Sequence, residues 1–216
     1  MEKATDRPGS LRDILFLPLG CLLSLRPMVV FGLLIGVAFF GGYFYYFVNV
    51  DLFGIGAPHF DELTISPDFR RISQVDGSYL TVTYENNQDS FFTGLIRHIS
   101  PIRLGDYPVL THDILVTSGD FADPGKVNTS VFNHHFSWTS ADVHPDGTIN
   151  LLHAVPVNEG LYQQLLSLQN GQTVRIKGRE ILRIEAFSPQ GGSKGWWQDE
   201  GCNTLVVTSV DILPGP

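Results

Sequence analysis

The chain has 216 residues and a formal net charge of −8, with 14 Lys and Arg against 22 Asp and Glu. An acidic chain is a poor candidate for nucleic-acid binding, because contacts with phosphate need clustered Lys and Arg. Its 22 Gly, 13 Pro and 15 Phe, together with many β-branched residues, favour a turn-rich β domain over a helical bundle.

Residues 27–48 form an apolar stretch without Asp, Glu, Lys, Arg, His, Asn or Gln. At ~1.5 Å per residue, a helix of this length covers a ~30 Å hydrocarbon core. The stretch is longer than the h-region of a signal peptide, and no A-x-A-like cleavage site follows it. We interpret it as a single transmembrane helix that is retained as an anchor in the membrane lipid.

Small and aromatic residues mark two regions of this helix. Gly32 and Gly36 lie on one face as a small-xxx-small motif, which predicts that another helix packs there. Tyr43 and Tyr46 belong to an aromatic belt at the outer interface and are candidate partner contacts.

The distribution of basic residues orients the predicted helix. Four of them lie within residues 1–26, and the next ones after the helix are Arg70 and Arg71. By the positive-inside rule, residues 1–26 form a cytoplasmic tail with an interfacial segment, and the large domain lies across the membrane. In a bacterium this places the domain in the periplasm, anchored to the inner membrane. Cys21 and Cys202 then lie on opposite sides and cannot pair.

After a connector over residues 49–77, we predict a periplasmic β domain over 78–216. Asn158 is positioned to cap a short helix that ends near Gln169, with Leu161 and Leu165 on one face. A short helix among antiparallel strands favours a small barrel of the OB kind or a related sandwich. The predicted strands cover residues 79–84, 91–98, 108–117, 131–139, 148–156, 172–178, 181–187 and 204–213.

Seven histidines invite a metal-site hypothesis, but their spacing does not favour it. His134 and His135 are adjacent in a predicted strand, so they point to opposite faces and cannot both bind one ion. No H-x-x-x-H or H-E-x-x-H pair is present. We expect no metal and no cofactor; the first residues to test for one would be His134 or His135, His153 and His112.

The sequence also lacks the usual marks of a catalytic site. There is no G-x-S-x-G elbow, and Cys202 has no neighbouring signature that would lower its pKa. The acidic pairs Asp61-Glu62 and Asp199-Glu200 are predicted to be solvated loop residues. We therefore expect that the protein is not an enzyme.

Two consecutive tryptophans stand out near the C-terminus. Trp196 and Trp197 cannot both face one core if they lie in a strand. One of them is therefore a candidate surface contact for a partner.

From about residue 107 to 213, the sequence resembles a family of bacterial single-pass membrane-anchored proteins with no assigned activity. The resemblance implies an anchored periplasmic β domain of the OB kind and no catalytic role. Asn203 stands where the family has an acidic residue, and Leu151-Leu152 replaces an Asn-containing approach to His153. The matching segments are Asp113 to Pro124, His153 to Pro156, Gly171 to Gly178, Trp196-Trp197 and Gly201-Cys202-Asn203.

These observations favour a non-enzymatic accessory subunit of a larger inner-membrane complex, which could be photosynthetic, respiratory or involved in transport. It would pack against other integral membrane subunits through its helix and cover their periplasmic side. The alternative is a free-standing, membrane-anchored binding module for a peptide, glycan or small ligand. A metal-dependent or hydrolytic enzyme is the third hypothesis.

Overall fold

The computed structural model describes residues 27–47, 60–142, 144–199 and 201–214. The chain divides into two compact units, Met1–Val50 and Asp51–Pro216. The predicted cytoplasmic tail 1–26, with Cys21, lies outside the described residues, and so does the first part of the predicted connector, 49–59.

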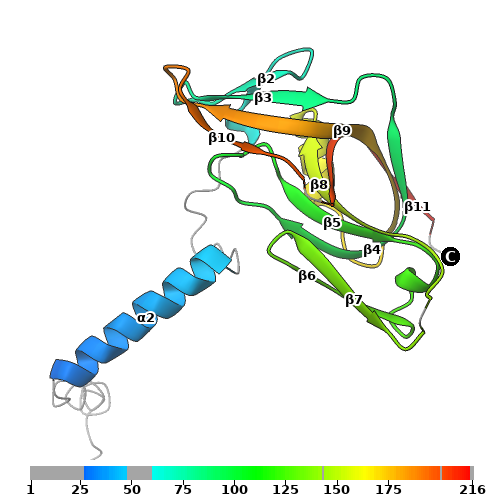
Figure 1. The fold of residues 1–216 in the computed structure, drawn as a ribbon, viewed down its shortest axis with the longest axis horizontal. Coiled ribbons are helices and arrows are strands. Elements are labelled where there is room, and N and C mark those ends of the chain that lie inside the picture. The colour runs from blue at the N-terminus through cyan, green and yellow to red at the C-terminus, as the bar shows by residue number, and fades with distance from the viewer. Residues whose placement is uncertain (1–26, 48–59, 143, 200, 215–216) are drawn as a thin grey trace, which may run out of the picture. The chain divides into compact units, whose positions relative to one another are not determined.

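The described part of the first unit is the helix α2 (Pro27–Phe47), drawn in blue in Figure 1. Its formation follows from a run of apolar residues without an interior proline. Eight large apolar side chains between Val29 and Phe40 are exposed by 48–76%. The side chains of Tyr43 and Tyr46 lie outside the described ones, so the aromatic belt stays a prediction.

The expected transmembrane helix over 27–48 is not supported as such. Among the residues that the structure describes, no helix is long and apolar enough to cross a membrane.

The second unit is mainly β, as the sequence predicts, and five of its strands close into a ring. They are β4 (Ser90–Pro101), β5 (His112–Thr117), β8 (Ile149–Pro156), β11 (Asn203–Leu213) and β9 (Thr173–Phe187), in this order of pairing. The ring closes because β9 also pairs with β4. The expectation of an antiparallel barrel is wrong at one place: β8 and β11 run parallel. Their connection passes through a helix and the long strand β9, which allows this direction.

A second sheet extends from the C-terminal half of β9. There β9 pairs with β3 (Tyr79–Tyr84) on one side and with β10 (Ser193–Trp197) on the other. The strand bends from the ring into this sheet, as Figure 1 shows. The predicted strands 172–178 and 181–187 are therefore one strand of 15 residues.

The sheet continues into the segment that the sequence assigned to a connector. The short strands β1 (Thr64–Ile65) and β2 (Arg71–Ser73) extend it beyond β3, after the 3-10 turn η1 (Phe60–Glu62). Phe60 and Ile72 are buried by this arrangement. The β domain therefore begins by residue 60 rather than at residue 78.

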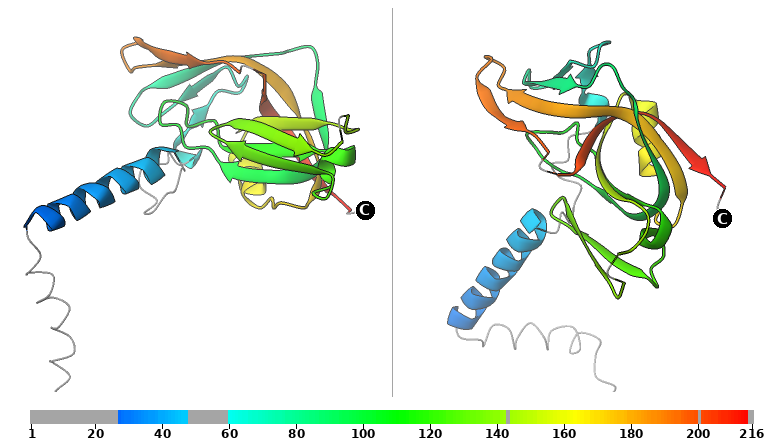
Figure 2. Two further views of the ribbon diagram at one scale, coloured as in Figure 1. Left: turned by 60° about the horizontal axis from the view of Figure 1, so that its bottom comes forward. Right: turned by 45° about the vertical axis from the view of Figure 1, so that its right-hand side comes forward.

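The predicted strand 131–139 is instead a hairpin, formed by β6 (Val127–Phe132) and β7 (His135–Ser140). It follows the 3-10 turn η2 (Gly119–Ala122) and lies beside β4 and β5 in Figures 1 and 2. Its two turn residues, Asn133 and His134, have φ angles of 48° and 63°. Positive φ at both positions is the requirement of a type I′ turn, which suits the twist of a two-residue hairpin.

The predicted helix 158–169 is present as α3 (Glu159–Leu166). The Asn158 side chain accepts a hydrogen bond from the Leu161 N–H at 2.9 Å, as expected of an N-cap. Leu165 and Leu168 are buried in a cluster with apolar residues of the ring strands. One face of the helix therefore packs on the apolar interior of the ring, while Leu166 on another face is 49% exposed.

Strands β5 and β8 are buried on both faces. Leu152 and Ala154 of β8 pack with α3 in the ring interior, whereas Val155 belongs to the second apolar cluster, outside the ring wall. His153 lies between Leu152 and Ala154 in the strand and therefore faces the same outer side as Val155. This covered outer face of the ring wall holds most of the buried polar groups.

Candidate functional site

Three polar side chains occupy one row across neighbouring strands of the ring. Asp113 of β5 lies directly opposite His153 of β8, and His153 lies directly opposite Thr204 of β11. All three are at most 4% exposed. Register alone therefore brings together residues that are far apart in the sequence.

Asp113 binds two histidines at once. Its Oδ1 accepts a hydrogen bond from His153 Nδ1 at 2.7 Å, and its Oδ2 accepts one from His134 Nδ1 at 2.8 Å. His134 comes from the tip of the β6–β7 hairpin. The carboxylate thus fastens the hairpin tip to the ring wall.

On its other side, His153 approaches a second carboxylate. Its Nε2 lies 3.5 Å from Oδ1 of Asp199, which belongs to the segment between β10 and β11. The hydroxyl of Thr204 donates to Asp199 Oδ2 at 2.5 Å and accepts from Trp197 Nε1 at 3.1 Å. His153 therefore sits between two carboxylates, each held in place by further hydrogen bonds.

Trp197 also packs against the two histidines. Its ring meets those of His153 and His134 nearly at right angles, with centroids 5.5 and 6.2 Å away. A large apolar ring at this place limits water access and strengthens the charge interactions behind it.

The pKa values of the cluster reflect this arrangement. Burial alone would lower the pKa of His153, but hydrogen bonds to Asp113 and Asp199 raise it to about 9. Burial likewise opposes ionisation of both carboxyl groups, yet hydrogen bonds with the histidines, and with Thr204 at Asp199, lower their pKa values. At neutral pH the site therefore contains an imidazolium between two carboxylates.

Cys202 lies next to this cluster and is a thiol, not a thiolate. Burial, followed by the charges of Asp199 and Asp113, raises its pKa to about 11. Its Sγ lies 3.8 Å from the backbone oxygen of His134. A protonated thiol in an acidic surrounding is a poor nucleophile.

The backbone at the hairpin tip suggests that the His134 side chain has a role. Glycine or asparagine is the usual residue at positive φ, and histidine there pays a conformational cost. Here the cost is offset by the hydrogen bond to Asp113 and the contact with Trp197.

The structure brings together only some of the residues that the sequence singled out. His134 and His153 meet, but His135 is exposed at the start of β7, and His112 faces away from Asp113 and bonds to Thr111. The sequence argument placed His134 and His135 on opposite faces of one strand. That premise is wrong, because His134 lies in a turn and only His135 lies in a strand. Asp199, predicted to be a solvated loop residue, is instead part of the cluster.

The other predicted contact residues lie at different places in the structure. Trp197 faces the cluster, while Trp196 is 55% exposed and lies under the guanidinium of Arg183 at 5.0 Å. One of the two tryptophans is thus at the surface, as predicted. Gly32 and Gly36 lie in α2, and a Cβ built at either meets no described atom within 4 Å.

Potential metal ligands converge in two overlapping groups within the described residues. One is Asp113, His134 and His153; the other is His153, Asp199 and Cys202. In each group the ligand atoms lie within 4.8 Å of one another. The expected absence of a metal rested on a strand that the structure replaces with a hairpin.

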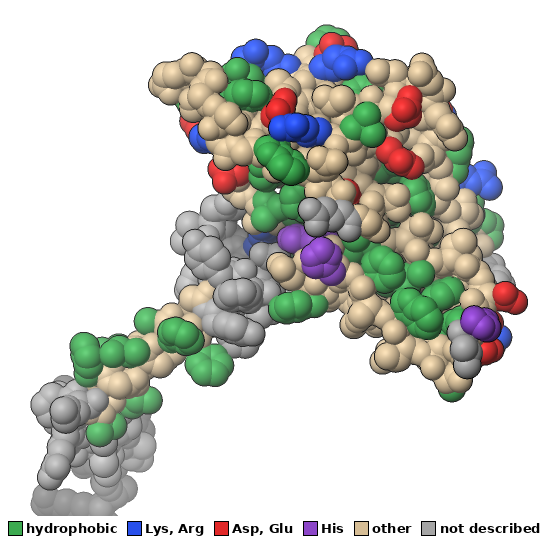
Figure 3. All heavy atoms as spheres, viewed as in Figure 1, with side chains coloured by type: hydrophobic (Ala, Val, Ile, Leu, Met, Phe, Trp, Pro, Cys, Tyr) green, Lys and Arg blue, Asp and Glu red, His purple; other side chains and the backbone are tan. Residues whose placement is uncertain are grey.

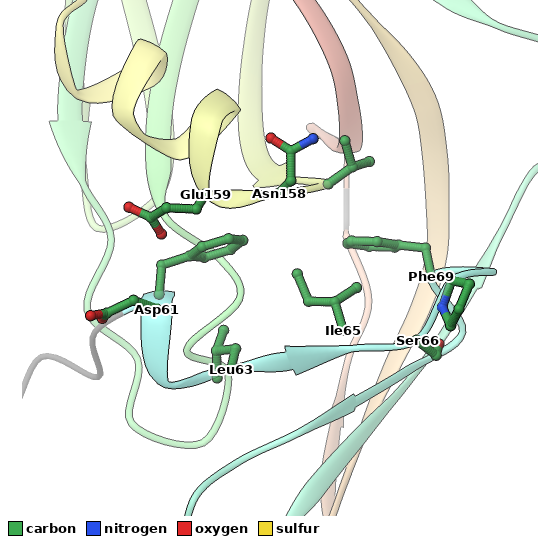
Figure 4. Close-up of a pocket in the computed structure, with 10 residues that line it drawn as sticks. Asp61, Leu63, Ile65, Ser66, Phe69, Asn158 and Glu159 are labelled. Atoms are coloured by element: carbon green, nitrogen blue, oxygen red, sulfur yellow. The ribbon is translucent and has the colours of Figure 1, made fainter.

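A pocket of about 530 Å³ lies elsewhere, between η1, β1 and the start of α3. Figure 4 shows Leu63, Ile65 and Phe69 around it, with the carboxylates of Asp61 and Glu159 on one side. None of its lining residues belongs to the histidine–carboxylate cluster. This pocket and the polar cluster therefore lie at different places in the domain.

His112 gives a prediction for acid pH. Burial lowers the pKa of His112 to about 4, despite the opposing charge of Asp113. In the unfolded chain this histidine takes up a proton near pH 6.5. The contribution of neutral His112 to the free energy of unfolding is therefore intact above pH 6.5 and is lost as the pH falls toward 4. Chemical denaturation should show that the free energy of unfolding falls between pH 7 and pH 4 in both proteins. The fall should be about 3 kcal/mol smaller in His112→Gln than in the wild type. Equal losses in both proteins would contradict this assignment.

No family model matches this sequence, and none of the curated proteins matches it either. The resemblance to a bacterial membrane-anchored family therefore stays a prediction.

Proposed function

We propose that this chain is a non-enzymatic accessory protein of a larger inner-membrane complex, to which α2 attaches it. The membrane-anchored chain would have its N-terminal side in the cytoplasm and its β domain in the periplasm. The β domain would cover the periplasmic side of the partner subunits. The observation that carries this proposal is the exposed apolar surface of α2.

The apolar surface of α2 is expected to be in contact with lipid or with another protein. Eight large apolar side chains within about three turns are exposed by 48–76%, and the helix contains no charged residue. A contiguous apolar surface of this kind is rarely left in water, and it is typical of contacts with lipid or protein.

Glycines provide a place for a second helix. Gly32 and Gly36 are one turn apart, and no described atom lies within 4 Å of a Cβ built at either position. Small residues let two helix backbones approach closely, which is how helices associate in lipid. This face of α2 therefore supports contact with another membrane subunit.

The polar cluster of the β domain supports a non-enzymatic role. The thiol of Cys202 is held protonated, and His153 carries a proton on each ring nitrogen at neutral pH because its pKa is raised to about 9. Nucleophilic catalysis needs an activated nucleophile beside a base with a free lone pair. Among the described residues, every buried side-chain nitrogen and oxygen has a hydrogen-bond partner, which is typical of a structural network.

Leucine at both glycines tests this attachment. Gly32→Leu with Gly36→Leu should reduce the partner protein recovered with the tagged full chain about tenfold, since the larger side chains hold the helices apart. The measurement is quantitative mass spectrometry after mild detergent extraction, with native gels to follow the complex. Leu34→Phe is the matched control, because it enlarges an apolar side chain on the opposite face of the helix and should leave recovery unchanged.

Two outcomes would contradict the proposal. The wild-type chain could migrate as a monomer under every mild extraction condition. Alternatively, it could be recovered in the soluble fraction of broken cells with α2 intact.

A second function, a membrane-anchored binding module for a peptide, glycan or small ligand, is favoured by a different observation. Two aromatic rings on the β3–β9–β10 sheet pair with cations: Arg71 lies over the half-buried Tyr79 at 3.8 Å, and Arg183 lies over the exposed Trp196. The five-stranded ring, with Leu165 and Leu168 of a short helix packed against its interior, also supports an OB-like barrel, a fold that often binds chain-like ligands. The face in Figure 3 shows basic and acidic side chains interspersed, which does not favour nucleic acid. A thermal-shift screen of the full chain in which no ligand class raises the Tm would count against this alternative.

A further inference from the structure

We propose that His153, Asp199 and Cys202 bind a zinc ion at the outer face of the ring wall, with Asp113 holding the ligand histidine. The ligand atoms would be His153 Nε2, a carboxylate oxygen of Asp199 and Cys202 Sγ. This site goes beyond the accessory function and does not depend on α2.

The separations suit a small ion. The three ligand atoms lie within 4.8 Å of one another, and His153 Nε2 is 3.5 Å from Asp199 Oδ1. Tetrahedral zinc with bonds of about 2.0–2.3 Å places its ligand atoms roughly 3.3–3.8 Å apart. A small movement of the Cys202 side chain, which is only partly buried, is enough to close the remaining difference.

The surroundings of His153 are those of a metal ligand. Zinc-bound histidines almost always donate their other ring N–H to a carboxylate, a backbone carbonyl or a water, which fixes the ring and the tautomer. His153 Nδ1 donates to Asp113 at 2.7 Å, so Nε2 is the nitrogen that points toward Asp199 and the proposed ion. Asp113 is itself held by His134, whose backbone oxygen lies beside the Cys202 sulfur.

The ligand set selects the metal. One imidazole, one carboxylate and one thiolate form a mixed nitrogen, oxygen and sulfur set that suits zinc, whereas magnesium and calcium prefer oxygen alone. Binding displaces the proton on His153 Nε2 and the thiol proton of Cys202, because ligands must be deprotonated. The two positive charges of the ion replace these two protons, so the net charge of the cluster does not change.

Three ligands leave a fourth position on zinc for water or for another donor. Asp199 and Cys202 are partly exposed, whereas His153 is 1% exposed. The ion would therefore connect the buried ring wall with the segment between β10 and β11 at the surface.

The test uses the full chain in mild detergent, in a Cys21→Ser background so that Cys202 is the sole thiol. After treatment with EDTA and desalting, the protein is titrated with zinc, cobalt or magnesium. We expect one zinc per chain after a second desalting step, no retained magnesium, and a thiolate-to-cobalt charge-transfer band in the near ultraviolet. Cys202→Ser should abolish that band and weaken zinc binding about 100-fold, and Asp113→Asn should weaken it about 10- to 100-fold.

His135→Gln is the matched control, since it removes an exposed histidine next to the hairpin tip and should leave zinc affinity unchanged. Wild-type protein that retains no zinc, or forms its cobalt complex without a thiolate band, would overturn the proposal. The same conclusion follows if Cys202→Ser binds zinc as tightly as the Cys21→Ser protein. The cobalt spectrum of the Cys21→Ser protein tests the proposal even if the Cys202→Ser or Asp113→Asn variant fails to fold.

Discussion

Replacing Asp113 by alanine is expected to lower the free energy of unfolding of the β domain by about 3–5 kcal/mol, because it removes the carboxylate that makes the shorter contact with the buried His153 imidazolium. Asp113 is 4% exposed and bonds to His153 at 2.7 Å and to His134 at 2.8 Å. Without it, the His153 imidazolium keeps only Asp199, 3.5 Å away. The measurement is urea unfolding of the full chain in mild detergent at pH 7 with EDTA, followed by tryptophan fluorescence.

Two variants control this experiment. Asp89→Ala removes a carboxylate that pairs with Lys177 at the surface, and the unfolding midpoint should hardly move because solvent screens such pairs. Asp113→Asn should cost less than Asp113→Ala, because the amide oxygen can still accept one of the two histidine hydrogen bonds. A loss below about 1 kcal/mol in Asp113→Ala would show that the buried network contributes little.

The second large effect is expected at Gly178 of β9, where the pairing with β4 ends while the pairing with β11 continues to Glu180. A Cβ built there lies 2.2 Å from the backbone oxygen of Val206 and 2.7 Å from Leu205 Cγ. Gly178→Ala should therefore destabilise the domain by about 3 kcal/mol, as overpacking against backbone does. The thermal midpoint and the urea midpoint should both fall.

Gly105→Ala is the matched control, because nothing lies within 4 Å of the Cβ built at Gly105. Its effect should stay within about 0.5 kcal/mol. A wild-type midpoint for Gly178→Ala would mean that β9 and β11 do not approach as closely as the ring requires.

Local sequence patterns correctly predicted two kinds of element: strands in which buried and exposed side chains alternate, and a helix that begins at a capping residue. The alternation in Tyr79–Tyr84 and the Asn158 cap with its leucines each placed an element within a few residues of its observed bounds. The apolar run likewise predicted the helix α2. In these segments the burial pattern is set by one neighbouring surface, so a short window of sequence contains the necessary information.

Other elements could not be predicted because contacts distant in sequence determine them. Asn133-His134 lacks the glycine of a typical hairpin turn, so the β6–β7 hairpin looked like one strand. The break expected after Gly178 is absent, because β9 bends there to serve two sheets. Phe60 and Ile72 showed no period, yet Phe60 is buried and stacks on Tyr162, and Ile72 is buried in a core cluster with Leu80.

The candidate site was missed for the same reason. Asp113, His153 and Thr204 meet only through strand register, and Asp199 joins them from a loop that looked solvated. One local signal could have placed His134 at a turn. Asn133 and His134 lie between two segments in which apolar and polar residues alternate, and asparagine is common in hairpin turns.

The accessory function rests on contact between α2 and another membrane protein. The most direct test is a photo-crosslinking residue at position 36 of the full chain in intact cells, compared with the same residue at position 34. Position 36 lies on the glycine face, and position 34 lies on the opposite side of the helix. We predict a covalent adduct with a second membrane protein from position 36 and far less from position 34. Irradiation that yields no protein adduct from position 36 would contradict the account.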